Sequence, residues 1–240
     1  MNLLTRTHLS APMGEDVTAM FDRIAPRYDR ANSVLSFGVH GRWRRKAARA
    51  AKVPSGGRAL DLATGTGDLA FLLEKAAGPE GEVIGSDVSE GMLAEARRKA
   101  AERGSRARFE RDDAMHLPYI SRTFDAVTIA FGIRNVDDPE RALREMARVL
   151  RPGARAVVLE FGTPQGALRA PYRWYSRFVM PRVGGAITGD REAYEYLPRT
   201  AATFPFGEAF AAMMRDAGFK DVKAEPLTGG IAWLYVGVAP

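Results

Sequence analysis

The segment from Asp61 to Asp68 (DLATGTGD) combines two glycines with acidic residues, a pattern that suits the binding of a small ligand. Gly65 and Gly67 have no side chain, so a ligand can approach the backbone closely on either side of Thr66. A helix-like run follows, and a helix N-terminus offers unpaired N–H groups and a positive dipole end. Asp87 comes twenty residues after Gly67, where a carboxylate can accept hydrogen bonds from ribose hydroxyls. These residues predict a nucleoside ligand.

The glycine loop alone leaves the kind of nucleoside open. Together with Ala70 it also fits the G-x-G-x-x-G/A fingerprint of dinucleotide-binding proteins, so a nicotinamide cofactor and S-adenosylmethionine both remain. Asp61 favours the second, because a pyrophosphate gains nothing from a carboxylate that could hold a ligand ammonium group through water. Asp113 and Ala114 follow the third expected strand, where a carboxylate can meet the adenine amino group and an N–H a ring nitrogen.

The surrounding sequence predicts alternating strands and helices. Short apolar runs typical of strands lie at 58–63, 81–86, 107–111, 124–130 and 154–161, and helix-like segments at 68–77, 90–103 and 139–150. This alternation predicts an α/β fold with a doubly wound Rossmann-like sheet. Two last strands at 219–224 and 232–238 predict a C-terminal antiparallel β-hairpin. Ligands bind beyond the carboxyl ends of such strands.

Two segments lie outside the alternation and predict lids. Residues 1–52 are expected to form an N-terminal helical lid segment, with a helix from Val17 that Pro26 interrupts. Residues 53–240 are expected to form the Rossmann-like domain. A second lid of short helices is inserted in it at about 163–205, where prolines and aromatic residues break the strand–helix pattern.

Composition excludes several kinds of site. The chain has no cysteine, which removes disulfides and thiolate chemistry, and its three histidines, His8, His40 and His116, are not spaced as metal ligands, so we predict no metal. The absence of a long apolar run and of a signal peptide predicts a cytoplasmic protein. The net charge is +6, but 29 of the 35 basic residues are Arg, as in GC-rich genomes, so charge alone does not indicate nucleic acid.

Two long segments of the chain resemble the demethylmenaquinone and ubiquinone-biosynthesis C-methyltransferase family, which is part of the class I S-adenosylmethionine-dependent methyltransferases. The stretch from Tyr28 to Trp43 follows the family pattern Y-D-x-M-N, then S, then H-x-x-W, with Ala31 in place of Met. Residues 148–160 follow a second family segment, with small departures at Arg151, Ala154 and the nearby Gly162. Residues 131–136 and 190–197 resemble its post-strand and lid motifs, so the resemblance covers about residues 17–240.

The resemblance implies S-adenosylmethionine as cofactor and ring methylation of a polyprenylated quinol, demethylmenaquinol to menaquinol, in menaquinone or ubiquinone biosynthesis. It implies cofactor contacts for Thr66 in the loop, Asp87 at the ribose, and Asp113 with Ala114 at the adenine. Ala130 ends the fourth strand where the family commonly has Ser, so a hydroxyl contact worth about 1 kcal/mol is lost or supplied by water.

Methylation of a ring carbon needs an aligned nucleophile and a base or cation that makes the hydroxyl phenolate-like, so a reduced quinol is the expected substrate. Arg134, beside Asn135 after the fourth strand, could stabilise the phenolate, His40 could take a proton, and Tyr28 could orient the hydroxyl. Each has a structural alternative: a surface salt bridge for Arg134, packing or capping for His40, and a core aromatic role for Tyr28.

The segment 168–182 mixes aromatic side chains with arginines, which can lie at an interface and meet anionic headgroups. It predicts peripheral association with an anionic membrane surface, with an aromatic lid packed on the core as the alternative. A homo-oligomer is compatible with the sequence.

Three other functions are alternatives to quinol methylation. A methyltransferase of another aromatic ring or small molecule keeps the same cofactor site. An NAD-dependent reductase would need a Tyr-x-x-x-Lys pair, and an RNA methyltransferase an Asn-Pro-Pro-Tyr-type loop, where this chain has Ala130-Phe131-Gly132. Neither motif occurs.

Overall fold

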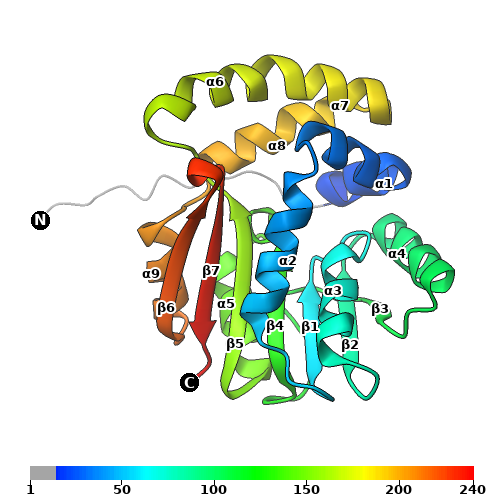
Figure 1. Ribbon diagram of the computed structural model, residues 1–240, viewed down its shortest axis with the longest axis vertical. Coiled ribbons are helices and arrows are strands. Elements are labelled where there is room, and N and C mark those ends of the chain that lie inside the picture. Colours follow the sequence, from blue (N-terminus) through cyan, green and yellow to red (C-terminus); the bar gives the residue numbers. More distant parts are fainter. Residues whose placement is uncertain (1–14) are drawn as a thin grey trace, which may run out of the picture.

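The computed structural model describes residues 15–240, and side chains from residue 17, so His8 lies outside the described residues (Figure 1). Its centre is a seven-stranded sheet in the order β3-β2-β1-β4-β5-β7-β6. The parallel strands are β1 (Arg58–Leu62), β2 (Glu82–Asp87), β3 (Arg108–Arg111), β4 (Phe124–Ala130) and β5 (Leu150–Phe161). β7 (Ala232–Val238) runs antiparallel to β5 and to β6 (Lys220–Leu227). The predicted doubly wound sheet with a C-terminal hairpin is confirmed.

Helices cover both faces of the sheet because its central strands are apolar on both sides. Ala59 and Leu60 on β1 are both fully buried, yet they belong to two different core clusters, one on each face. The elements are α2 (Val39–Ala51), α3 (Asp68–Ala77) and α4 (Glu90–Arg103) on one face, and α5 (Pro139–Val149) and α9 (Glu208–Asp216) on the other.

Local capping signals fix the ends of the helices next to the strand ends. Ser89 precedes α4 and its hydroxyl accepts from the backbone N–H of Met92 at 3.1 Å, while Gly104 ends that helix in the left-handed conformation. The strand β5 begins at Leu150, earlier than predicted, because Leu150 pairs with Phe124 ahead of an irregularity in the ladder.

The remaining helices lie above the carboxyl ends of the parallel strands (Figure 1). They are α1 (Glu15–Leu35), α6 (Arg169–Trp174), α7 (Met180–Thr188) and α8 (Arg191–Thr203), with a π-helical stretch, η3 (Tyr175–Val179), joining α6 to α7. A third core cluster, which includes Ile24, Ala31, Met92 and Tyr194, joins α1 to α4 and α8. Within residues 15–240, no helix is both long and apolar enough to cross a membrane.

The N-terminal segment divides between two environments. α1 packs with α7 and α8, whereas α2 packs on the sheet through Trp43 and Ala47. The predicted interruption at Pro26 is wrong, since α1 continues through it. Ile24 and Ala25 next to Pro26 are 1% and 3% exposed, and this tertiary packing outweighs the hydrogen bond that proline removes.

Candidate active site

Two cavities lie beyond the carboxyl ends of the strands and share a wall. The first has a volume of about 230 Å³, is lined by residues such as Gly65, Asp87 and Asp113, and is called the polar cavity here. The second has a volume of about 380 Å³, lies between the turn from α1 to α2 and the helices α6, α7 and α8, and is called the apolar cavity. Tyr28 and Phe131 line both, so a ligand in one cavity lies next to a ligand in the other.

Asp87 stands at the end of β2 with its carboxylate oriented by the backbone. Its Oδ2 accepts from the N–H of Gly65 at 2.8 Å and its Oδ1 from the N–H of Ser89 at 3.0 Å. Burial raises the pKa of Asp87, and these hydrogen bonds oppose the rise. A carboxylate oxygen has two lone pairs, so each can accept another hydrogen bond from a ligand hydroxyl in the polar cavity.

The polar cavity has an acidic lining. Asp87, Asp112, Asp113 and Asp137 line it, and the described lining residues include no Lys or Arg. A pyrophosphate would place more negative charge beside these carboxylates, whereas a nucleoside that carries a positive charge complements them. Charge therefore separates the two ligands that the glycine loop had left open, in favour of a sulfonium nucleoside.

The backbone around the polar cavity is shaped for close approach. Gly65 has φ +56°, and nothing lies within 4 Å of the place where a Cβ would be. Ala63 (φ 45°) and Phe131 (φ 60°), just beyond β1 and β4, adopt the same left-handed conformation although they carry side chains. Such residues cost about 1–3 kcal/mol each and cluster at ligand sites. The residues present fit S-adenosylmethionine: a ribose acceptor, an acidic surface and an open backbone cradle.

Five of the eight predicted cofactor residues line the polar cavity: Gly65, Asp87, Asp113, Ala114 and Ala130. Asp61 does not. It is 1% exposed, and its two oxygens accept from the hydroxyls of Thr64 and Thr128 at 2.7 and 2.6 Å. Burial raises the pKa of Asp61 to about 6. Asp61 thus supports the glycine loop from the buried side, through Thr64. Its predicted contact with a ligand through water stays a prediction.

Thr66 and Gly67 also lie outside the cavity lining. The Thr66 hydroxyl donates to Asp29 Oδ1 at 2.6 Å, so it joins the loop to α1. Gly67 caps α3 with φ +85°, and a Cβ there would approach Phe109 to 2.9 Å. Both residues therefore shape the loop in this structure.

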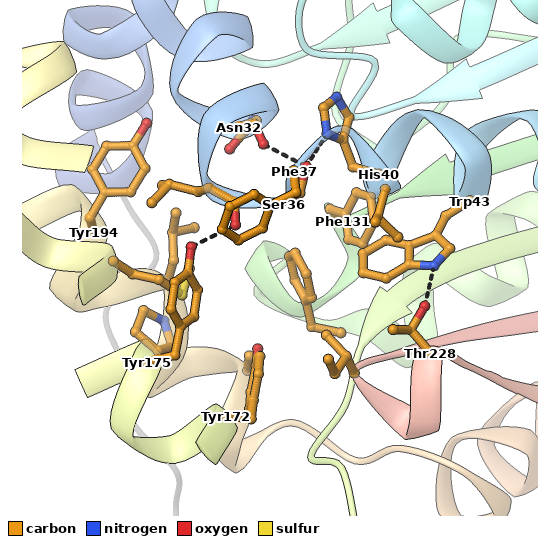
Figure 2. A pocket seen from close by; sticks show the side chains of 18 of the residues that line it. Asn32, Ser36, Phe37, His40, Trp43, Phe131, Tyr172, Tyr175, Tyr194 and Thr228 are labelled. Atoms are coloured by element: carbon orange, nitrogen blue, oxygen red, sulfur yellow. Dashed lines mark hydrogen bonds between the residues drawn. The ribbon is translucent and has the colours of Figure 1, made fainter. Parts of the chain in front are cut away.

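Aromatic side chains line the apolar cavity (Figure 2). His40 and Trp43 lie on one side and Tyr172 and Tyr175 on the opposite side. Trp43 packs against Phe131, with ring centroids 6.1 Å apart. Flat apolar walls of this kind suit an aromatic ring with a hydrocarbon substituent.

Arg134 lies in the wall of the apolar cavity within a buried ion pair. Its Nη1 is 2.6 Å from Glu160 Oε1, both side chains are 2% exposed, and the same nitrogen donates to the Phe131 carbonyl at 2.6 Å. The surface salt bridge weighed as an alternative is thus a buried one. In the described part of the chain, Arg134 Nε has no hydrogen-bond partner although it is buried. A buried donor without a partner suits an oxygen supplied by a ligand.

His40 and Tyr28 both line the apolar cavity, where each could meet a substrate. Burial, and then the positive charge of Arg44, lower the pKa of His40, so its imidazole is neutral at pH 7 and can accept a proton. Burial raises the pKa of Tyr28, so its hydroxyl keeps its proton and can donate a hydrogen bond.

Asn135 shares a cavity with Tyr28 but not with Arg134 or His40, the other two predicted catalytic residues. It lines the polar cavity, and its Oδ1 accepts from the Tyr196 hydroxyl at 3.4 Å. The predicted pair Arg134 and Asn135 thus divides between the two cavities. Two further residues were not predicted from the sequence: Glu160, the partner of Arg134, and Lys99, whose ammonium group lies 2.7 Å from Asp29. The only sequence signal for Lys99 is the pair of aspartates, Asp22 and Asp29, on one face of the same helix.

The chain is similar to known proteins over most of its length. A profile of the ubiE/COQ5 methyltransferase family matches residues 10–239. A demethylmenaquinone methyltransferase of Thermus thermophilus is 53% identical and covers 92% of this chain and 100% of that protein. The ubiquinone/menaquinone biosynthesis C-methyltransferase UbiE of Bdellovibrio bacteriovorus is 45% identical, over 95% of this chain and 97% of that protein. A solved S-adenosylmethionine-dependent methyltransferase of Thermotoga maritima, a possible histamine N-methyltransferase, has a TM-score of 0.65 at 23% identity, covering 92% and 99% of the two chains.

Proposed function

The chain belongs to the ubiE/COQ5 methyltransferase family, and from this premise we propose that it methylates a ring carbon of a polyprenylated quinol, converting demethylmenaquinol to menaquinol. It is an S-adenosylmethionine-dependent C-methyltransferase of quinone biosynthesis. The observation that carries the proposal is that the acidic polar cavity and the aromatic-lined apolar cavity share a wall at Tyr28 and Phe131.

The polar cavity would hold the cofactor with its ribose on Asp87 and its adenine near Asp113 and Ala114. When bound, S-adenosylmethionine supplies an electrophilic methyl group on a sulfonium. Phe131 and Tyr28 would stand on either side of the passage through which that methyl group meets the ring. Acceptor and donor are then aligned without a covalent enzyme intermediate.

The groups of the apolar cavity would activate the ring. Arg134 Nε would donate to the quinol oxygen and stabilise its developing negative charge, with Glu160 holding the guanidinium in place. Neutral His40 would take the hydroxyl proton of the quinol, and the Tyr28 hydroxyl would orient the ring oxygen. The proton that the methylated ring carbon loses would then return to the ring oxygen, so that one proton leaves the quinol in all. These roles would make the reduced quinol reactive while the oxidised quinone, which has no hydroxyl to ionise, would not react.

The direct test supplies purified protein with radiolabelled S-adenosylmethionine and demethylmenaquinone that is either chemically reduced or left oxidised. Label is expected in the ring of the reduced compound only. Entry of label into neither compound would contradict the substrate, and equal entry into both would contradict the requirement for a hydroquinone.

Arg134→Lys tests the proposed contact with the quinol oxygen. Lysine keeps a positive charge beside Glu160 but removes the Nε donor, so we expect kcat to fall by about two orders of magnitude, the scale of losing one such donor. The dissociation constant of S-adenosylmethionine should stay within about twofold of the wild-type value. Arg144→Lys, an exposed residue of α5, serves as the matched control. The reverse pattern, weak cofactor binding with normal kcat, would make Arg134 a cofactor residue.

The same cavity distinguishes the quinol from another aromatic ring as substrate. A prenyl substituent would lie along the side chains of Leu35, Leu168 and Met180, which line the apolar cavity. Removing the tail from the quinol should therefore raise KM by tenfold or more. If the ring without a tail is methylated with the same KM, a small-molecule methyltransferase becomes the better description.

A membrane surface is the proposed source of the prenylated substrate. Phe37 at the turn after α1 is 84% exposed and Trp174 on α6 is 61% exposed. Trp174 contacts the ring of Phe178, with ring centroids 6.3 Å apart, and the guanidinium groups of Arg177 and Arg182 lie 5.5 and 6.0 Å from that ring. Exposed aromatic rings flanked by arginines match the apolar boundary and anionic headgroups of a lipid surface.

Flotation with vesicles tests this association. The protein is expected to float with vesicles that contain phosphatidylglycerol at low salt, and less with pure phosphatidylcholine. Trp174→Ser should weaken flotation, whereas Ile120→Ser removes a more fully exposed apolar side chain (82%) from the loop before β4 and should not. Failure to float with anionic vesicles at low salt would contradict the proposal.

A further inference from the structure

Helix α1 is fastened to the cofactor loops by two carboxylates on one face. Asp22 and Asp29 are seven residues apart, about two helical turns, so their side chains point the same way. Asp22 Oδ1 accepts from the Ser89 hydroxyl and from the N–H of Gly91 at 2.8 Å. Asp29 accepts from the Thr66 hydroxyl at 2.6 Å and from Lys99 Nζ at 2.7 Å.

The contacts of Asp22 and of Asp29 both lead to Asp87, the proposed ribose carboxylate. Ser89, which binds Asp22 through its hydroxyl, donates its backbone N–H to Asp87 at 3.0 Å. Gly65, next to Thr66 in the chain, donates its N–H to the other oxygen of Asp87 at 2.8 Å. A continuous set of hydrogen bonds therefore links α1 to the residue that would bind the cofactor.

Lys99 is the buried centre of the second attachment. Its side chain is 8% exposed, and its ammonium group donates to Asp29 at 2.7 Å, to Asp68 at 2.5 Å and to Thr66 at 3.1 Å. These three acceptors use all three of its protons and come from α1, α3 and the glycine loop, while Lys99 itself belongs to α4. One cation thus joins four parts of the chain.

The position of α1 matters to both cavities. Val17, Thr18 and Phe21 line the polar cavity, and Tyr28, directly before Asp29, lines both. A displacement of Asp29 from Lys99 would therefore open the polar cavity on its α1 side and move the wall that separates the two ligands.

We propose that Lys99 is a positioning residue that holds α1 closed over the cofactor through Asp29 and Thr66. Its side chain lines neither cavity and acts by fixing the helix that carries Tyr28. The inference takes only the cofactor from the proposed function and does not depend on the identity of the methyl acceptor.

Lys99→Met and Asp29→Asn break this attachment from its two sides. The dissociation constant of S-adenosylmethionine, measured by titration calorimetry, should rise about tenfold in each, the scale of one charge-assisted hydrogen bond. The double variant should be no weaker than either single one, since both remove the same link. Lys75→Met, an exposed lysine on α3, is the matched control and should bind as the wild type does.

Hydrogen exchange without ligand separates positioning from general destabilisation. In Lys99→Met, amides of α1 should exchange about tenfold faster, while those of α5 on the opposite face keep the wild-type rate. Equal acceleration in α1 and α5, unchanged affinity in the single variants, or additive effects in the double variant would overturn the proposal. Asp29→Asn leaves Lys99 paired with Asp68, so this variant carries the test if Lys99→Met does not fold. Failure of the wild type itself to bind S-adenosylmethionine would instead contradict the proposed function.

Discussion

At the scale of single residues, Asp87 has a carboxylate that the backbone holds in place and whose oxygens can still accept hydrogen bonds from a ligand. Its two backbone hydrogen bonds fix both oxygens, so a ligand meets a carboxylate that needs no rearrangement. Asp87→Ala is expected to weaken the binding of S-adenosylmethionine by about 2 kcal/mol, roughly thirtyfold in the dissociation constant. Titration calorimetry measures this, with exposed Glu192→Ala on α8 as control. An unchanged affinity would remove Asp87 from the site.

Asp61 makes the stability of the protein depend on pH. Its pKa rises from 3.8 to about 6 on folding, so between these values the native state holds a proton that the unfolded chain has lost. Stability therefore falls as pH rises through this window, by about 3 kcal/mol from this group. Asp61→Asn cannot ionise, and urea denaturation at pH 4 and pH 6.5 should show a smaller fall than in the wild type. Equal falls in both proteins would show that Asp61 does not titrate in this range.

The sequence predicted those residues of the polar cavity whose position follows from being next to a strand end. Asp87, Asp113 and Ala114 needed only the strand assignment and the rule that ligands bind at the carboxyl edge. The pairing of Arg134 with Glu160 could not be predicted from the sequence, because it depends on β5 lying beside β4 and on how far each strand extends. The same holds for Lys99, which meets its partners only when four elements are in place.

At the scale of elements, the packing of α7 on α8 depends on a missing side chain. A Cβ on Gly184 would lie 2.2 Å from the ring of Tyr194, which is fully buried and lines the apolar cavity. Gly184→Ala should separate the two helices, lower stability by about 1–3 kcal/mol and raise KM for the quinol. Gly41→Ala adds the same methyl group to α2, where only Arg45 Nη1 at 3.7 Å lies near, and should be tolerated. Denaturation and steady-state kinetics distinguish the two, and an unaffected Gly184→Ala would show that the lid readily adapts.

Secondary structure was predictable where the signal is local. The bounds of α3 and α4 were predicted as observed, because Gly67 and Ser89 start them and Gly78 and Gly104 end them. The course of α1 through Pro26 was not, because the burial of Ile24 and its neighbours against other helices is invisible in the local pattern. Short helices were predicted at about 163–205, but no local sequence signal indicated the π-helical stretch Tyr175–Val179 that connects α6 to α7.

At the scale of the whole molecule, the shared wall predicts that the two ligands bind cooperatively. Closure of α1 around the cofactor fixes Tyr28, which also lines the apolar cavity. S-adenosylhomocysteine should therefore tighten the binding of a singly prenylated quinone analogue by about fivefold, or about 1 kcal/mol, and the analogue should tighten the binding of S-adenosylhomocysteine by the same factor. Calorimetric titration of each ligand with and without the other checks both directions. Independent binding would show that α1 closes without regard to the cofactor.

The two edges of the sheet constrain how copies of the chain could assemble. At one edge, β3 has only four residues; at the other, β6 is largely exposed and carries Lys220, Lys223, Glu225 and Pro226. Shortness, charge and a proline each discourage the addition of a foreign strand. Two copies of this protein would accordingly have to associate through helical surfaces. Even at high protein concentration, the edge strands of neighbouring copies should not pair into one continuous sheet.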